Sequence, residues 1–235
     1  MGTLYLVPTP LGNLSDITLR AIETLKQVDL IACEDTRRTL KLLNHLGIAK
    51  PLYSYHAHSS PRKLGALVQA LQSRKQVALV SDAGTPGLSD PGTPLVQAAI
   101  EANIPVISLP GPCAAITALV GSGLPTDRLF FIGFLPRRAI RAKRVLAVAS
   151  ATEATIVIYE SPYRTAETLG WIEEVVGPET PVVIARELTK IHEEYLRGTA
   201  RGLHERLAAS PPLGEIVILF DARGVGTAKT LPEEE

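Results

Sequence analysis

Three carboxylates in this sequence stand where they could take part in chemistry. Glu34 and Asp35 follow the apolar run "DLIAC", and Asp82 follows the apolar run "VALV". A carboxylate within hydrogen-bond reach of a bound hydroxyl can accept its proton or orient its lone pair. The alternative is structural: Asp82 braces its own loop, and Glu34 or Asp35 pairs with Arg37. Both interpretations stay open on the sequence alone.

Other kinds of chemistry have less support. Glu160 and Lys190 are weaker acid–base candidates. The motifs GxxxxGK[ST], GxGxxG and HExxH are absent. The sequence therefore gives no motif support for nucleotide hydrolysis, dinucleotide redox chemistry or zinc-dependent proteolysis. Cys33 and Cys113 fit neither a CxxC nor a Cys/His spacing, and we expect no metal.

Four short segments directly follow the expected strands, and three of them are rich in glycine or proline. They read "VPTPLGN" (7–13), "CEDTR" (33–37), "SDAGTPGLSDPG" (81–92) and "LPGPCAA" (109–115). The carboxyl ends of parallel strands meet at one edge of a sheet, and glycine lets a ligand approach the backbone there. The sequence therefore predicts one binding cleft at that edge. Ordinary turn chemistry is the alternative for each segment taken singly.

The elements that would position these segments follow an α/β pattern. Apolar runs alternate with amphipathic stretches up to about residue 122, which predicts a parallel sheet covered by helices. We expect Asp16 to cap the first helix and Gly47 to end the second. Beyond "GSGLPTDR" (121–128) strands follow each other more directly. This favours two domains: an N-terminal parallel-sheet α/β domain, 1–122, and a C-terminal α+β domain with a mixed sheet, 123–235. A disordered tail is expected from Gly224.

Composition narrows the class of protein further. The 235 residues are 46% hydrophobic and 20% charged with a formal net charge of zero, which is typical of a globular protein with no overall attraction to nucleic acid or anionic membrane. We find no signal peptide and no apolar run near the ~18 residues that a membrane span needs. With two cysteines, the sequence predicts a soluble protein of the reducing cytoplasm.

The ordered motifs "VPTPLGNLSDIT", "CEDTRRT", "SDAGTPGLSDPG", "PGPCAAITAL", "FIGFLP" and "YESPYR" resemble those of the RsmI family. The resemblance extends through "ARELTKIHEE" and "GEIVIL" nearly to the end of the chain. It implies an S-adenosylmethionine-dependent 2'-O-methyltransferase acting on a decoding-centre cytidine of 16S ribosomal RNA. It also implies a homodimer with the two-domain fold of the tetrapyrrole methylase superfamily (class III methyltransferases), in which the cofactor lies in the crevice between the domains.

The resemblance also implies which residues contact S-adenosylmethionine. They lie in the segments after the expected strands and are Leu11, Ala83, Gly84, Thr85, Leu88, Cys113, Ala114, Glu160, Leu188 and Gly214. The sequences "PTPLG" and "GTP" stand where tetrapyrrole-methylating relatives commonly carry a glycine-rich loop and Gly-Asp-Pro, which argues against a porphyrin-like substrate. Cys113 replaces a more usual serine and Tyr163 a more usual histidine.

A basic segment offers a place for RNA. No acidic residue occurs from Leu129 to Thr152, and clustered Arg and Lys neutralise RNA phosphates. A solvated helix face is the alternative explanation for such a run of charge. The candidate RNA contacts are Arg137, Arg138, Arg141, Lys143 and Arg144 in this segment, with Arg37, Arg38, Arg62, Lys63 and Arg164 extending the track.

Two other functions remain as alternatives. A small-molecule methyltransferase acting on a tetrapyrrole would not need the basic segment. A non-catalytic RNA-binding protein would keep the basic segment but would bind no S-adenosylmethionine.

Overall fold

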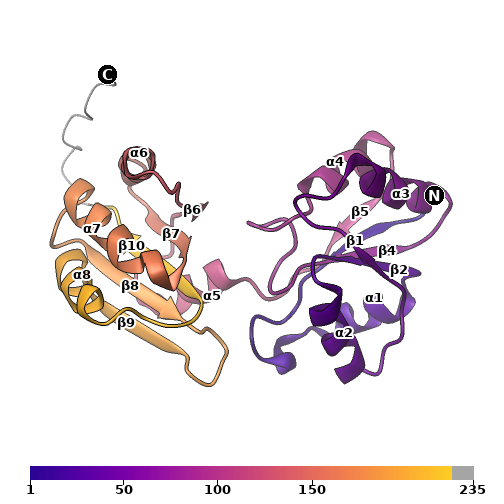
Figure 1. Ribbon diagram of the computed structural model, residues 1–235, viewed down its shortest axis with the longest axis horizontal. Helices are drawn as coiled ribbons and strands as arrows, with labels where there is room; N and C mark the ends of the chain where they lie inside the picture. The colour runs from indigo at the N-terminus through magenta and orange to yellow at the C-terminus, as the bar shows by residue number, and fades with distance from the viewer. Residues whose placement is uncertain (224–235) are drawn as a thin grey trace. The chain divides into compact units, whose positions relative to one another are not determined.

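The computed structural model describes residues 1–223, and the tail expected from Gly224 lies outside the described residues (Figure 1). The chain divides into two compact units, 1–113 and 114–235. The division falls before the expected boundary at 122/123. Each unit contains its own sheet and is described separately below.

The first unit is built on a five-stranded sheet in the order β3-β2-β4-β1-β5, and every neighbouring pair is parallel. Its strands are β1 (Leu4–Val7), β2 (Leu30–Cys33), β3 (Leu52–Ser54), β4 (Val77–Val80) and β5 (Val106–Ser108). The central strand β4 is buried along its whole length. A parallel sheet covered on both faces needs such uniformly apolar strands, and the expected parallel α/β domain is confirmed.

Helices cover both faces of this first sheet, with α1 and α2 on one face and α3 and α4 on the other (Figure 1). The helices are η1 (Leu14–Asp16), α1 (Leu19–Gln27), α2 (Thr36–His45), α3 (Pro61–Gln72) and α4 (Thr93–Glu101). The first pair buries Leu25 and Leu43 against the sheet, and the second pair buries Leu71 and Leu95. Two hydrophobic clusters, one on each side, therefore hold the sheet rigid beneath the loops at its edge.

The second unit contains a mixed five-stranded sheet in the order β6-β7-β10-β8-β9, as expected. Its strands are β6 (Leu129–Phe134), β7 (Thr155–Glu160), β8 (Pro181–Arg186), β9 (Glu194–Thr199) and β10 (Ile216–Asp221). Only β6 and β7 run parallel, and the other neighbours are antiparallel. Phe220 on β10 is fully buried in a hydrophobic cluster of this unit.

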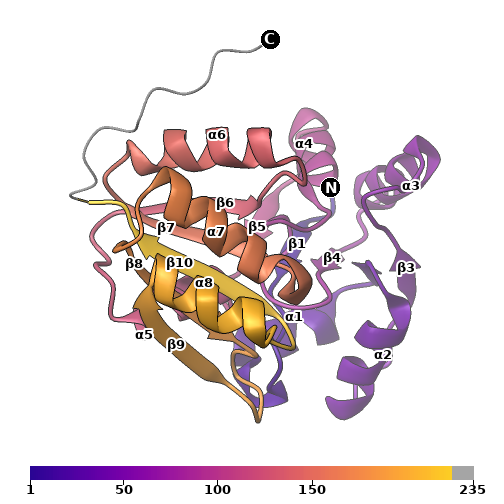
Figure 2. The same cartoon turned by 60° about the vertical axis from the view of Figure 1, so that its left-hand side comes forward.

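Three helices lie side by side on one face of the second sheet, as Figure 2 shows, and one helix contacts the sheet without joining their cluster. The helices are α5 (Ala114–Ser122), α6 (Ala139–Ser150), η2 (Pro162–Arg164), α7 (Thr165–Val175) and α8 (Ala200–Ala209). The contacts of α5 explain why it belongs to this unit. Arg197 of β9 donates to the carbonyls of Gly121 and Ser122 at the end of α5, at 2.7 and 3.0 Å. The cluster of glycines there ends a helix and does not separate the domains.

The expected cap of the first helix is wrong. Thr18 is the N-cap of α1, and its hydroxyl accepts a hydrogen bond from the Ala21 amide at 3.1 Å. Asp16 instead ends the short turn η1, which Asn13 caps. The expected end of the second helix is confirmed, because Gly47 adopts a left-handed φ of 65° just after α2.

The corrected cap can be tested with a pair of variants. Thr18→Ala should lower the free energy of unfolding by about 1 kcal/mol, because it leaves an amide of the first helical turn without its acceptor. Asp16→Ala should change it by less than about 0.5 kcal/mol. Urea denaturation followed by circular dichroism measures both, and a larger effect for Asp16→Ala would contradict the assignment.

Candidate functional site

The loops after β1, β4 and β5 are tied together at the carboxyl edge of the first sheet. The Thr9 amide donates to the Gly84 carbonyl and the Gly84 amide donates to the Thr9 carbonyl, each at 2.9 Å. The Thr85 hydroxyl donates to the Pro112 carbonyl at 2.9 Å. Gly84 has a left-handed φ of 79°, and a Cβ there would lie 3.1 Å from the Leu11 side chain. The close approach of the two loops therefore requires glycine.

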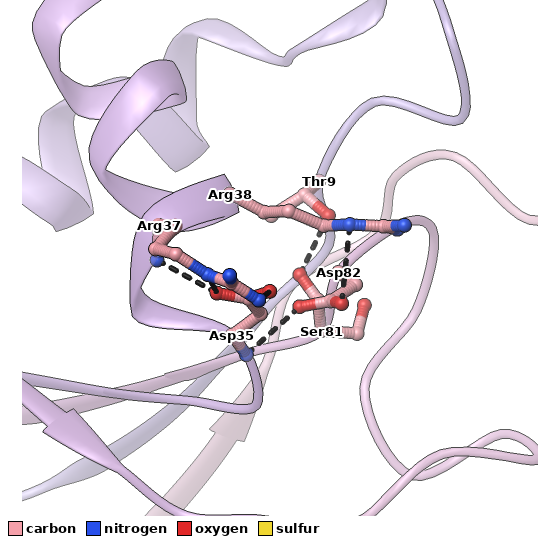
Figure 3. Close-up of polar contacts among 6 residues, drawn as sticks. All are labelled: Thr9, Asp35, Arg37, Arg38, Ser81 and Asp82. Carbon is pink, nitrogen blue, oxygen red and sulfur yellow. Dashed lines mark hydrogen bonds and ion pairs between the residues drawn. The ribbon is translucent and has the colours of Figure 1, made fainter.

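Three of the four expected strand-end segments are thus brought into contact, and the fourth joins them through Asp82 (Figure 3). Asp82 accepts a hydrogen bond from the Asp35 amide at 3.1 Å, which ties the turn after β2 to the loop after β4. Its other oxygen lies 3.6 Å from Nε of Arg38 on α2. The Thr9 hydroxyl donates to the Ser81 carbonyl at 3.1 Å. The four segments therefore meet at one edge of the sheet as a set of hydrogen-bonded loops.

The candidate carboxylates have different environments. Asp35 is the N-cap of α2, and both of its oxygens bind the Arg37 guanidinium, at 3.1 and 2.8 Å. Hydrogen bonds from Arg37 lower the pKa of Asp35 to about 2. A carboxylate with such a low pKa is a poor general base near neutral pH, so the geometry favours the structural role. Glu34 is half-buried beside it.

One titratable residue at this edge was missed by the sequence analysis. Asp90 is half-buried in the same loop, and burial together with the charges of Glu34 and Asp82 raises its pKa from 3.8 to about 6, while the Ser81 side chain opposes the shift. The signal was present, because "SD" occurs twice in this loop, at 81–82 and 89–90. The structure brings Glu34, Asp82 and Asp90 close enough to interact electrostatically.

In the second unit, the remaining residues of the expected cofactor set lie at one end of the sheet. Glu160 ends β7 and is paired with Ile216 of β10, which is paired in turn with Arg186 of β8. Leu188 follows β8 and Gly214 precedes β10 at this same end. Ala114 opens α5, whose next amide donates to the hydroxyl of Tyr159 on β7 at 3.1 Å.

The Glu160 carboxylate is occupied within its own unit. Its side chain is completely buried, and its oxygens accept hydrogen bonds from the Ser161 amide and the Thr168 hydroxyl, both at 2.8 Å. Arg164 lies 3.5 Å away and donates to the carbonyls of Leu135 and Pro136, which precede α6. Arg164 therefore anchors the segment before the basic helix, and its own guanidinium is half-buried. The weaker candidate Lys190 forms ion pairs with Glu187 and Glu215.

The other RNA-binding candidates are distributed over both units. Arg137, Arg138 and Arg141 are exposed at the start of α6, and Arg144 is exposed one turn further along. Lys143 is bound to Glu174 of α7 at 2.6 Å. In the first unit, Arg62 is exposed at the start of α3, whereas Lys63 donates to the Ser54 carbonyl at 2.9 Å. Within residues 1–223 no helix is long and apolar enough to cross a membrane, and no His, Cys, Asp and Glu side chains form a group suited to a metal.

Comparisons with known proteins show which class of protein this chain belongs to. Residues 3–204 match the family model described as Tetrapyrrole (Corrin/Porphyrin) Methylases. Among solved structures, uroporphyrin-III C-methyl transferase from Thermus thermophilus, complexed with S-adenyl homocysteine, aligns with a TM-score of 0.64 at 17% identity, over 94% of this chain and 98% of that one. The fold is therefore that of this class of methylases.

Curated relatives give the narrower family. "Ribosomal RNA small subunit methyltransferase I" of Synechocystis sp. is 48% identical over 94% of this chain and 79% of its own length. The protein of the same name from Hydrogenobaculum sp. is 49% identical over 92% of this chain and 94% of its own length. The chain belongs to the ribosomal RNA small subunit methyltransferase I family, and the resemblance seen in its sequence motifs is confirmed.

The shifted pKa of Asp90 predicts a pH-dependent stability. The unfolded chain releases the Asp90 proton near pH 3.8, whereas the folded protein holds it until about pH 6. This group therefore costs stability as the pH rises from 4 to 6, and the cost remains above pH 6. Asp90→Asn should raise the free energy of unfolding at pH 8 by about 1 kcal/mol, after allowing for solvent screening, and should have no effect at pH 4.

Thermal unfolding of Asp90→Asn and the parent protein at both pH values measures this difference. A stabilisation that is equal at pH 4 and pH 8 would show that the ionisation of Asp90 is not its source.

Proposed function

We propose that this protein transfers the methyl group of S-adenosylmethionine to the ribose 2'-hydroxyl of a cytidine in small-subunit (16S) ribosomal RNA. The observation that carries the proposal is the identity of 48–49%, over more than nine tenths of the chain, to relatives named ribosomal RNA small subunit methyltransferase I. The cytidine and the 2'-oxygen rest on the motif resemblance. Bound S-adenosylmethionine supplies an electrophilic methyl group with its own leaving group.

The loops of the first unit fit such a cofactor. Within the segment from Ala83 to Leu88, Gly84 is hydrogen-bonded to Thr9 and Thr85 is hydrogen-bonded to Pro112. A fixed backbone with small side chains lets a flat, partly polar ligand approach closely without reorganisation. We assign cofactor binding in this unit to Leu11, Ala83, Gly84, Thr85, Leu88 and Cys113.

In the second unit we assign cofactor binding to Ala114, Glu160, Leu188 and Gly214, which lie at one end of the sheet. The Glu160 carboxylate is already saturated by internal partners, so its contribution would come from the main chain. The contribution of all these residues to the reaction is alignment and exclusion of water, which can supply about 7–11 kcal/mol of a barrier.

RNA binding is assigned to the exposed cations that precede and begin α6. Arg137, Arg138 and Arg141 are exposed, whereas Lys143 and Arg164 are bound to partners within their unit. We further propose that the protein is a cytoplasmic homodimer, in keeping with a ribosomal substrate and the family resemblance. Light scattering after gel filtration tests the dimer.

Methyl transfer tests the proposed function directly. The purified full-length protein, labelled S-adenosylmethionine and small-subunit particles or naked 16S RNA should give a labelled RNA whose modified ribose can be mapped. Isothermal titration should show binding of S-adenosylmethionine. Binding without transfer to either RNA substrate would favour another methyl acceptor, for which a tetrapyrrole is the first to try. No binding of the donor would leave a non-catalytic RNA-binding protein.

The RNA-binding segment has its own test. Arg137→Glu, Arg138→Glu and Arg141→Glu together should weaken RNA binding by about tenfold or more and flatten its salt dependence, because each lost phosphate contact removes about 0.7–0.9 from the slope of log K against log salt. The affinity for S-adenosylmethionine should stay within twofold.

A control triple variant carries the same charge change at exposed positions elsewhere: Lys26→Glu, Lys75→Glu and Arg206→Glu. Equal weakening of RNA binding by both triple variants would indicate a general charge effect and would remove the assignment to this segment.

A further inference from the structure

The carboxyl edge of the first sheet also carries a cavity that is lined by none of the residues assigned to the cofactor. This cavity of about 420 Å³ lies between the loop after β1, helix α2 and the start of the loop after β4. This volume falls in the range of small-ligand sites. Residues of the cavity used below are Thr9, Leu14, Arg38, Lys41, Leu42 and Asp82.

The cavity lies beside the Thr9–Gly84 bridge, and its lining residues differ from those of the cofactor segment, Ala83 to Leu88. The cavity uses residues before the bridge on the β4 side, Ser81 and Asp82, together with α2, which follows β2. The segment from Ala83 to Leu88 continues from the bridge and is bound to Pro112, after β5. Because β2 and β5 lie on opposite sides of the β4–β1 pair, the two sites face opposite halves of one edge. Ten residues line the cavity, and none belongs to the assigned cofactor set.

The cavity carries the chemistry of a nucleotide site. Arg38 and Lys41 stand three residues apart on α2, a spacing that places two side chains on one face of a helix. Arginine and lysine are the preferred partners of phosphate in proteins. Leu14, which is 43% exposed, and Leu42 offer an apolar wall against which a base can lie.

The floor of the cavity is polar and fixed. Asp82 is held by the Asp35 amide and by Arg38, as Figure 3 shows, so its carboxylate has a defined position. Two of the lining residues are cations and one is a carboxylate, so the side of the cavity formed by Arg38 and Lys41 can take an anionic group. A carboxylate at the floor can accept a hydrogen bond from a sugar hydroxyl.

We propose that this cavity binds one nucleotide of the RNA substrate, with its phosphate on Arg38 and Lys41, its base against Leu14 and Leu42, and a ribose hydroxyl donating to Asp82. This inference rests on the proposed function, and it adds a place for the acceptor nucleotide next to the assigned donor site. Lys41 is a new candidate, and Arg38 becomes part of an open, concave site together with Asp82.

Two variants of the full-length protein test the proposal by binding, which does not depend on turnover. Lys41→Gln removes an exposed charge and should leave the fold intact; Arg38→Gln also removes the contact to Asp82. The double variant should weaken binding of small-subunit RNA by about tenfold. Its affinity for S-adenosylmethionine should stay within twofold. Lys26→Gln with Arg206→Gln is the matched control and should bind RNA within twofold of the parent.

A titration with cytidine 5'-monophosphate shows whether the cavity itself is occupied. In amide NMR spectra the nucleotide should shift the signals of Gly12, Leu14 and Lys41, and Lys41→Gln should weaken this binding at least fivefold. Inorganic phosphate should shift Lys41 but not Leu14, because it has no base to lie against the apolar wall.

Two other outcomes would overturn the proposal, and a third would overturn only the proposed function. Weaker binding of S-adenosylmethionine by Lys41→Gln would indicate that the cavity binds the methyl donor and not a nucleotide of the RNA. Unchanged RNA and nucleotide affinities in both variants would show that the cavity takes neither. Failure of the parent protein to transfer methyl groups, with these binding results intact, would contradict the proposed function and leave the nucleotide site standing.

Discussion

The paired hydrogen bonds between Thr9 and Gly84 are the constraint on which the functional edge depends. They join the loops that follow two neighbouring parallel strands, β1 and β4, just beyond the last paired residues, Val7 and Val80. A loop that leaves a strand is ordinarily the most mobile part of an α/β unit. Here two such loops stabilise each other, and the backbone at Gly84 and Thr85 is positioned before any ligand arrives. Such preorganisation lowers the entropy that binding would otherwise cost.

In the second unit, an ion pair with a buried carboxylate has a structural role. Glu160 and Arg164 lie 3.5 Å apart, and Thr168 completes the hydrogen bonding of the carboxylate. A buried carboxylate that lost its partners would be strongly destabilising, so the pair and its hydrogen bonds act as one unit. Arg164 also holds the carbonyls before α6, and the orientation of the basic segment is thereby linked to the end of β7.

Much of the fold and part of the site could be predicted from the sequence. The run "VALV" predicts a strand buried on both faces, and the glycines and prolines after it predict a loop that a ligand can approach. The sequence does not indicate which unit the helix α5 contacts, because "AAITALVGS" is apolar almost throughout and no periodicity shows which sheet it covers. Its place is decided by Arg197 and Tyr195, far away in the sequence.

Side-chain roles were less predictable than elements for a similar reason. Asp35 looked as available as Glu34 until the guanidinium of Arg37 was seen to occupy both of its oxygens. Lys41 carried no local signal that set it apart from a helix-surface lysine, and the repeated "SD" that marks Asp90 does not reveal which charges surround it. Their surroundings come from segments tens of residues away, and one-dimensional patterns do not contain that information.

The division of the chain after Cys113 has a consequence for how the protein is made. All five strands of the first sheet precede that point, although the strand that emerges first, β1, lies inside the sheet between β4 and β5. Translation of this portion takes on the order of ten seconds, and β1 has no complete set of partners until its end. In the nascent chain, the apolar strand β1 is therefore unpaired for most of this interval. The first unit can then assemble while the second unit is still being synthesised.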